Sequence, residues 1–194
     1  MNYVKSISKE EINTLPMLEF QGTIVLIEDT QHAIEIAKKL SQAKFLGFDT
    51  ETRPSFSQNQ YYKVALLQLA TEECAYLFRL NKMTFPKELA DILSNESIIK
   101  AGVAIQDDVK ALQKLYQFQP FGFVDLSKEA EKRQFKSFGL RALTAIFLGK
   151  RLSKAAKLTN WDQPTLTRPQ LNYAASDAWT GLMIYQKIIV LPLG

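Results

Sequence analysis

The chain has 194 residues, 46% of them hydrophobic and 23% charged, which is typical of a globular protein with one sizeable core. No apolar run approaches the ~18 residues of a membrane span, and the N-terminus lacks a signal peptide's apolar stretch, so we expect a cytoplasmic protein without a membrane partner. The single cysteine, Cys74, excludes an internal disulfide and a thiolate metal cluster. The net charge of +4 and the pI near 9.0 are compatible with a polyanionic partner.

The first half of the chain is predicted to alternate strands and helices. A capping box at Ser8 opens a short helix that ends near Pro16, a β-branched run follows, and Asp29 or Thr30 then caps a helix with one apolar face. The remaining elements of this half are expected at residues 45–50 (strand), 64–70 and 74–80 (hairpin), 87–93 (helix) and 98–103 (strand).

Helices dominate the second half. We expect a helix from Asp107, a short strand at 121–124, and helices near 126–132, 138–148 and 168–188. The last helix has a clear start, because Thr167 and Gln170 fit a capping box and Pro169 lies in the first turn. No repeat or long linker interrupts the chain, so residues 1–194 are predicted to form one α/β domain with a core at about 20–190 and helices on a central sheet.

Acidic residues recur at three places that could meet in space. Asp49 and Glu51 end an apolar strand, where residues two apart share a face. Tyr173 and Asp177 are four apart on the last helix and also share a face. If the carboxylates of Asp49, Glu51, Asp108 and Asp177 met in one cleft, they would repel one another unless hard divalent cations lay between them. This pattern indicates two-metal chemistry on phosphodiesters.

Each patch also has a structural interpretation. A lone acidic pair at a strand end is usually a surface pair, and an acid at the start of a helix is stabilised by the helix dipole. Asp107 fits that second role better than Asp108 does. Asp177 is harder to explain structurally, because aspartate is a poor residue for the middle of a helix.

The order and the amino-acid sequences of these motifs resemble those of the DEDD superfamily of 3′–5′ exonucleases, in the subgroup with tyrosine in the third motif. The matching segments are Phe48-Asp49-Thr50-Glu51-Thr52-Arg53-Pro54, Lys100-Ala101-Gly102-Val103-Ala104-Ile105 through Asp108, and Tyr173-Ala174-Ala175-Ser176-Asp177-Ala178. Three further segments are similar to the ribonuclease D and Werner-type branch: Phe138-Gly139-Leu140-Arg141-Ala142-Leu143, Leu148-Gly149-Lys150 and Asn160-Trp161-Asp162. The resemblance covers about residues 20–190.

This resemblance implies a ribonuclease-H-like fold, with a mixed central β-sheet flanked by α-helices. It also implies that four carboxylates hold two Mg²⁺ or Mn²⁺ ions and that Tyr173 orients the attacking water. The four are Asp49, Glu51, Asp108 and Asp177. The implied partner is a nucleic acid with a free 3′ end, and the implied product is a nucleoside 5′-monophosphate.

Basic and aromatic residues are candidates for substrate contacts. A basic strip formed by Lys150, Arg151, Lys154 and Lys157, and followed by Arg168, is either a solvated helix end and loop or a surface that contacts phosphates. The backbone of Thr50 and the side chain of Arg53 lie next to the acids in sequence. The aromatic residues Phe56, Tyr61 and Tyr62 belong either to a surface loop or to a platform on which terminal bases stack.

Three functions remain open at this level. The first is a metal-dependent 3′–5′ exonuclease. DNA is favoured over RNA because the short spacing from Gly149 to Trp161 and the minimal length resemble the Werner-type side. The second is a catalytically silent nucleic-acid-binding domain, although such a relative should lack one of the acids or the tyrosine. The third is a metal phosphohydrolase acting on small nucleotides.

Overall fold

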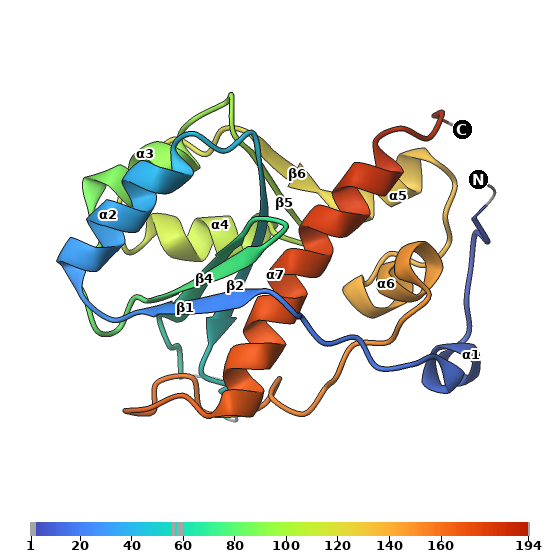
Figure 1. Cartoon of the computed structure of the whole chain (residues 1–194), viewed down its shortest axis with the longest axis horizontal. Coiled ribbons are helices and arrows are strands. Elements are labelled where there is room, and N and C mark those ends of the chain that lie inside the picture. The colour runs from blue at the N-terminus through green and yellow to red at the C-terminus, as the bar shows by residue number, and fades with distance from the viewer. Residues whose placement is uncertain (1–2, 56, 58–59, 194) are drawn as a thin grey trace.

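A six-stranded mixed sheet forms the centre of the computed structural model, which describes residues 3–55, 57 and 60–193. The strand order is β1-β4-β3-β2-β5-β6 (Figure 1). The β2–β3 and β3–β4 pairs are antiparallel and the other three are parallel. The strands are β1 (Thr23–Ile27), β2 (Phe45–Thr52), β3 (Val64–Ala70), β4 (Cys74–Arg79), β5 (Ile99–Gly102) and β6 (Phe123–Asp125).

Helices cover both faces of this sheet. Three helices pack on one face, namely α2 (Thr30–Leu40), α3 (Lys87–Leu93) and α4 (Gln106–Gln113). On the other face the long helix α7 (Arg168–Ile188) contacts every strand from β1 to β5. Around α7 lie α5 (Leu126–Lys132) and α6 (Leu140–Leu148), and the short α1 (Lys9–Thr14) rests on α6 (Figure 1).

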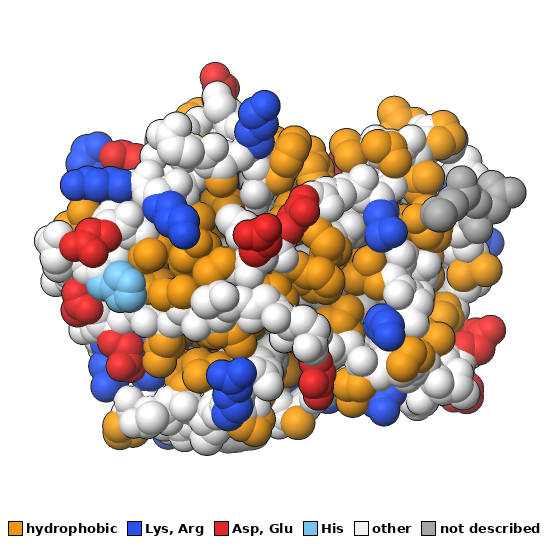
Figure 2. Space-filling model, in the orientation of Figure 1, with side chains coloured by type: hydrophobic (Ala, Val, Ile, Leu, Met, Phe, Trp, Pro, Cys, Tyr) orange, Lys and Arg blue, Asp and Glu red, His pale blue; other side chains and the backbone are white. Residues whose placement is uncertain are grey.

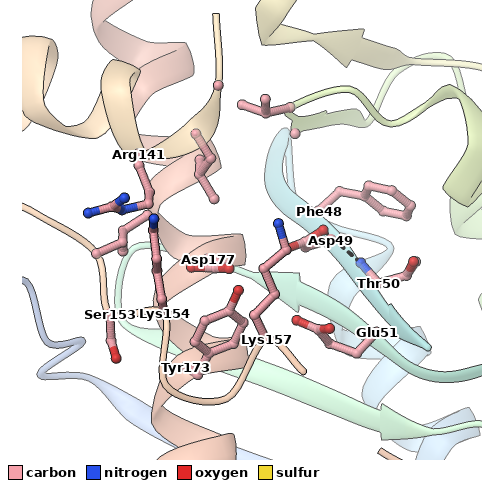
Figure 3. Close-up of a pocket in the computed structure, with 15 residues that line it drawn as sticks. Phe48, Asp49, Thr50, Glu51, Arg141, Ser153, Lys154, Lys157, Tyr173 and Asp177 are labelled. Carbon is pink, nitrogen blue, oxygen red and sulfur yellow. Dashed lines mark hydrogen bonds between the residues drawn. The ribbon is translucent and has the colours of Figure 1, made fainter. Parts of the chain in front are cut away.

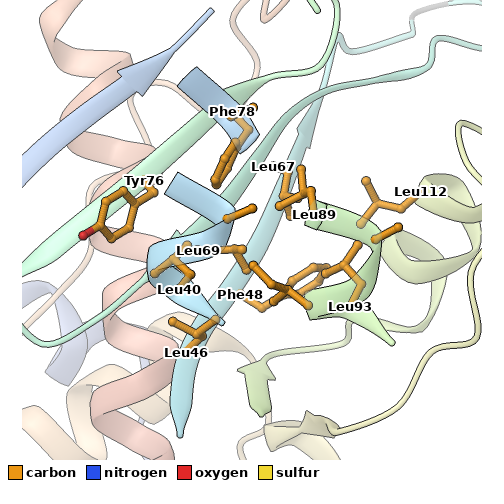
Figure 4. Close-up of a cluster of buried hydrophobic side chains, with 14 of the residues drawn as sticks. Leu40, Leu46, Phe48, Leu67, Leu69, Tyr76, Phe78, Leu89, Leu93 and Leu112 are labelled. Atoms are coloured by element: carbon orange, nitrogen blue, oxygen red, sulfur yellow. The ribbon is translucent and has the colours of Figure 1, made fainter. Parts of the chain in front are cut away.

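The largest apolar cluster lies between the sheet and the α2–α4 layer (Figure 4). Alternate residues of each strand face it, among them Phe48 of β2 and Leu67 and Leu69 of β3. Helices α3 and α4 contribute Leu89, Leu93 and Leu112, among others, from their apolar faces. All seven residues of β3 are buried because the strand is covered on both faces.

Helix α7 lies unusually close to the sheet because small residues line the contact. A Cβ added at Gly47 would lie only 1.9 Å from the carbonyl oxygen of Ala178, and one at Gly181 only 2.7 Å from that of Ala101. Ala174 and Ala178 are completely buried in the same contact. The close approach fixes the height of α7 above β2, which carries two of the predicted acids.

The predicted elements agree with the structure apart from their ends. Strand β2 continues to Thr52, two residues beyond the expected end, and β6 begins at Phe123 rather than 121. Gly122 causes this later start with its left-handed backbone, φ +69°, which turns the chain just before the strand. Helix α6 begins at Leu140 rather than 138 because Gly139 adopts an extended conformation as its N-cap.

The molecular surface carries charges of both signs. On the face shown in Figure 2, lysines and arginines alternate with acidic and apolar side chains and do not form a single basic patch. Within the described part of the chain, none of the helices is both long and apolar enough to span a bilayer.

Candidate active site

Strand β2 carries the first two acids to the α7 face of the sheet. Asp49 and Glu51 lie opposite Gln68 and Leu66 of β3, so the antiparallel pairing holds both carboxylates on one face. The carboxylate of Asp49 accepts a hydrogen bond of 2.9 Å from the backbone N–H of Thr50. Strand β2 therefore places Asp49 and Glu51 side by side, as predicted.

Helix α7 brings the remaining two residues of this group above β2. Thr167 and Gln170 form the expected capping box at its start, and Asp177 follows in its buried middle section. Carboxylate oxygens of Asp49, Glu51 and Asp177 lie within 4.8 Å of one another. Tyr173, one turn earlier on α7, points into the same space (Figure 3).

Asp108 approaches this group from the other side of β2. It lies in the first turn of α4 and accepts a short hydrogen bond from the hydroxyl of Thr50, whose side chain points away from those of Asp49 and Glu51. Ala104, between β5 and α4, adopts a left-handed conformation with φ 59°, and Asp125 accepts a hydrogen bond from its N–H. Asp108 thus lies beside the three-acid cluster, but its carboxylate is not among the oxygens that lie within 4.8 Å of one another.

The acids strongly perturb one another. Burial, Asp177 and Asp108 raise the pKa of Asp49 far above its ordinary range. Burial and the charges of Asp49, Asp177 and Asp108 raise the pKa of Glu51 to about 10, and burial raises the pKa of Asp177 to about 7. Burial also raises the pKa of Asp108. Without counter-charge, this cluster therefore retains protons at neutral pH.

Tyr173 is held in its protonated form. Burial and the charges of Asp177, Glu51 and Asp49 all raise the pKa of its hydroxyl. A hydrogen bond from this hydroxyl lowers the pKa of Asp177, partly offsetting the effect of burial. The tyrosine is therefore suited to donate a hydrogen bond, not to remove a proton.

A cavity of about 490 Å³ opens above the cluster and is basic on its far side. Lys154 and Lys157, from the segment between α6 and α7, line it together with Ser153 (Figure 3). Lys157 is close enough to the acids to lower the pKa of Glu51 and Asp177. Two of the three lysines in the predicted strip thus face the acidic cluster.

Of the other predicted substrate residues, Lys150 and Arg53 lie outside the cavity and Thr50 lines it. Lys150 borders a neighbouring hollow with Met17 and Trp179, because the backbone of Arg151 pairs with Pro16 and Leu18 and turns this part of the chain away. Arg53 is outside the cavity as well, with its guanidinium stacked on Tyr62 at 4.6 Å. The backbone of Thr50 lines the cavity, but its N–H is already bonded to Asp49.

The predicted aromatic platform is described only in part. Phe56 lies outside the described residues, and Tyr61 is almost fully exposed. Trp161 is completely buried and packs beside Tyr173, with ring centroids 6.1 Å apart. Its role is therefore to support the tyrosine and not to stack on a base.

Sequence reasoning missed Arg141 as a site residue. It lies in the first turn of α6, and its side chain lines the cavity on the side opposite Asp49 and Glu51 (Figure 3). Arg141 belongs to the Phe138–Leu143 segment that matches the family. The sequence does not show where its side chain points, because that direction depends on how α6 packs on α7.

The donor set fits divalent cations. Clustered carboxylate oxygens are the ligands that Mg²⁺ and Mn²⁺ prefer, and two positive charges would relieve the repulsion that raises these pKa values. Within the part of the chain that the structure describes, no histidine or cysteine joins the three-acid group. Hard oxygen-ligated ions are thus favoured over zinc.

Comparison with known proteins identifies the family. A family model described as 3′-5′ exonuclease matches residues 24–190. The chain belongs to this 3′-5′ exonuclease family. Mouse "Bifunctional 3'-5' exonuclease/ATP-dependent helicase WRN" is 36% identical over 91% of the chain, and the match spans 13% of the mouse protein. Ribonuclease D of Zymomonas mobilis is 30% identical over 78% of the chain and 39% of that protein.

Solved structures agree on the fold. Escherichia coli RNase D covers 87% of the chain with a TM-score of 0.80 at 24% identity, and the match spans 44% of that chain. The Aedes aegypti Nibbler EXO domain covers 97% with a TM-score of 0.75 at 22% identity, over 91% of that domain. The chain therefore has the ribonuclease-H-like α/β fold. Its family model and its sequence relatives place it in the ribonuclease D/Werner type of DEDD exonuclease. The three-acid cluster fits a divalent-metal-dependent member of this family.

Proposed function

We propose that this exonuclease removes single nucleotides from the 3′ end of a nucleic acid, with DNA as the preferred substrate, and uses two Mg²⁺ or Mn²⁺ ions. The products are a nucleoside 5′-monophosphate and a chain shortened by one nucleotide. The observation that carries the proposal is the approach of three carboxylates within 4.8 Å beside Tyr173, below a cavity with a basic far side.

Four carboxylates of the chain would act as the metal ligands. Asp49, Glu51 and Asp177 would hold the ions, with Asp108 as the fourth ligand reached from α4. When bound, the ions lower the pKa of a water molecule and stabilise charge on the phosphate and on the leaving 3′-oxygen.

Tyr173 would orient the attacking water. Its hydroxyl is protonated, so it can accept a hydrogen bond from the water while it donates one to Asp177. The water would give up one proton to solvent as its oxygen bonds to phosphorus. The bond from phosphorus to the 3′-oxygen would break, and that oxygen would take up a proton from solvent. Lys154 and Lys157 would contact the phosphate oxygens, and Thr50, Arg53 and Lys150 remain further candidates for substrate contact.

The experiment uses 5′-labelled oligonucleotides on a denaturing gel, with Mg²⁺, Mn²⁺ or EDTA. Single-stranded DNA, DNA with a recessed 3′ end and single-stranded RNA are compared, with Asp49→Ala as the inactive control. We expect a ladder that shortens from the 3′ end and disappears with EDTA and in the variant. Binding without shortening in either metal would contradict the proposal.

RNA is the second candidate substrate. It is supported by the likeness to E. coli RNase D, described as an exoribonuclease involved in structured RNA processing, and to a Trypanosoma brucei RNase D in complex with RNA U12. Discrimination between the two substrates depends on contacts to the 2′-hydroxyl. Faster shortening of the RNA strand in the same assay would replace DNA with RNA in the proposal.

A further inference from the structure

The cavity is acidic at one end and basic at the other. Asp49 and Glu51 on β2 and Asp177 on α7 form the acidic end. Arg141 lies across from them at the start of α6, on the same side as Lys154 (Figure 3). The scissile phosphate belongs at the acidic end with the ions, so the basic end needs a different anion.

Arg141 stands out because its guanidinium has no partner. Among the described residues it forms no hydrogen bond or ion pair, and its Nε is inaccessible to solvent without a hydrogen-bond acceptor. Arg79 also has a buried Nε without an acceptor, but its terminal nitrogens donate to Glu28 and to the carbonyl of Gln163. Arg133 and Arg151 likewise donate hydrogen bonds to carbonyls or carboxylates. A desolvated donor without an acceptor is rare in a folded protein, and a missing ligand is one explanation for it.

We propose that Arg141 binds a phosphate upstream of the scissile one, so that the site recognises a polynucleotide end and not an isolated nucleotide ester. This inference rests on the proposed exonuclease activity and adds the length of substrate that the site requires. The planar guanidinium can donate two parallel hydrogen bonds to one phosphate, which a lysine cannot do.

Arg141 does not act on the scissile phosphate itself. Lys157 is near enough to the acids to lower the pKa of Glu51 and Asp177, whereas Arg141 is not among the groups that shift either pKa. Its side chain also extends toward Lys154 and Ser153, away from Asp49 (Figure 3). The next phosphate along the strand is the anion that a bound nucleic acid would present at that side.

The test compares a substrate that has no upstream phosphate with one that has upstream phosphates. Thymidine 5′-monophosphate p-nitrophenyl ester has one scissile phosphodiester and nothing upstream, while a short oligothymidylate has several phosphates. We expect Arg141→Gln to lower kcat/KM for the oligonucleotide about 10- to 100-fold, mainly through KM, as for loss of a charged hydrogen bond. The ester should be hydrolysed as by the unchanged enzyme.

Two further variants separate charge from geometry. Arg141→Lys should restore only part of the lost oligonucleotide activity, because the charge remains without the fork of donors. Lys38→Gln removes one exposed positive charge from α2, on the opposite face of the sheet, and should leave both substrates unaffected. For Arg141→Gln, the plot of log(kcat/KM) against log[salt] should be shallower by about 0.7, as for one lost phosphate contact on a single strand.

Each outcome has a defined meaning. Equal losses on both substrates would place Arg141 on the scissile phosphate and overturn the proposal, and so would no loss on either. If the unchanged enzyme hydrolyses neither substrate, the proposed exonuclease activity itself fails. A thermal melt that matches the parent protein in all variants excludes misfolding as the cause.

Discussion

Tyr173 is the residue whose removal best separates catalysis from metal binding. Its hydroxyl is protonated and faces Asp177. We predict that Tyr173→Phe lowers kcat about 100-fold, as expected for a misplaced attacking water. The three carboxylates remain, so Mn²⁺ should bind with unchanged affinity, which isothermal titration calorimetry would measure. A large loss of Mn²⁺ affinity would instead make the tyrosine part of the metal site.

Asp177 should link stability to pH in the ion-free protein. Its pKa of about 7 in the fold exceeds its ordinary value of 3.8, so the folded state binds a proton more tightly than the unfolded state. The free energy of unfolding should therefore fall as pH rises through that window. We predict that Asp177→Asn removes the part of this fall that Asp177 contributes, while Asp49, Glu51 and Asp108 retain theirs, and stabilises the protein at pH 8 in EDTA by about 2–4 kcal/mol.

Asp107→Asn is the matched control for this change. Asp107 is highly exposed, and its carboxylate pairs with Lys110 at 3.2 Å in the same turn of α4 that carries Asp108. Urea unfolding of this variant should retain the parent's pH dependence. The interpretation of Asp177 is wrong if both variants behave alike.

At the scale of single residues, the sequence predicts part of the site. The pairing of Asp49 with Glu51 and of Tyr173 with Asp177 follows from the periods of a strand and a helix, which are local properties. The contact between Thr50 and Asp108 could not be foreseen, because it depends on the turn at Ala104 that sets the direction of α4.

At the scale of elements, the docking of α7 on β2 sets the spacing of the acids. Gly47 makes that docking possible, since its absent side chain leaves room for the carbonyl of Ala178. We predict that Gly47→Ala pushes α7 outward and lowers the free energy of unfolding by about 1–3 kcal/mol or more. Mn²⁺ affinity should fall too, because Asp177 moves away from Asp49 and Glu51.

Gly139→Ala is the control for the added methyl group. A Cβ at Gly139 would meet no atom within 4 Å, and the backbone there is extended. Urea unfolding should give the same or slightly higher stability than the parent protein. If the two glycine variants are equally stable, α7 does not depend on close contact at Gly47.

The elements themselves were well predicted, but the segment between α6 and α7 was not. Its lysines share one stretch of sequence, yet Lys154 and Lys157 line the cavity while Lys150 does not. The difference arises from Arg151, whose side chain donates to the carbonyl of Leu15 and ties the segment to the N-terminal part of the chain. Such long-range contacts leave no periodic signal in the sequence.

For the whole molecule, metal binding, proton release and stability should be linked. Glu51, with a pKa of about 10, and Asp177, with a pKa of about 7, must lose protons before they bind a cation. We predict that Mn²⁺ raises the melting temperature, and that it does so more at pH 8 than at pH 6. A saturating ion at 100 times its Kd would add about 2.7 kcal/mol of stability. The same increase at both pH values would mean that the acids bind the ion without releasing protons.

The order of the acids along the chain also has a consequence during protein synthesis. Asp49 and Glu51 leave the ribosome early, whereas Asp177 emerges only after most of the chain has been translated. Until α7 folds onto β2, a nascent chain has no complete acidic cluster. Under the proposed function, the growing polypeptide therefore acquires its complete metal site only when its last long helix docks.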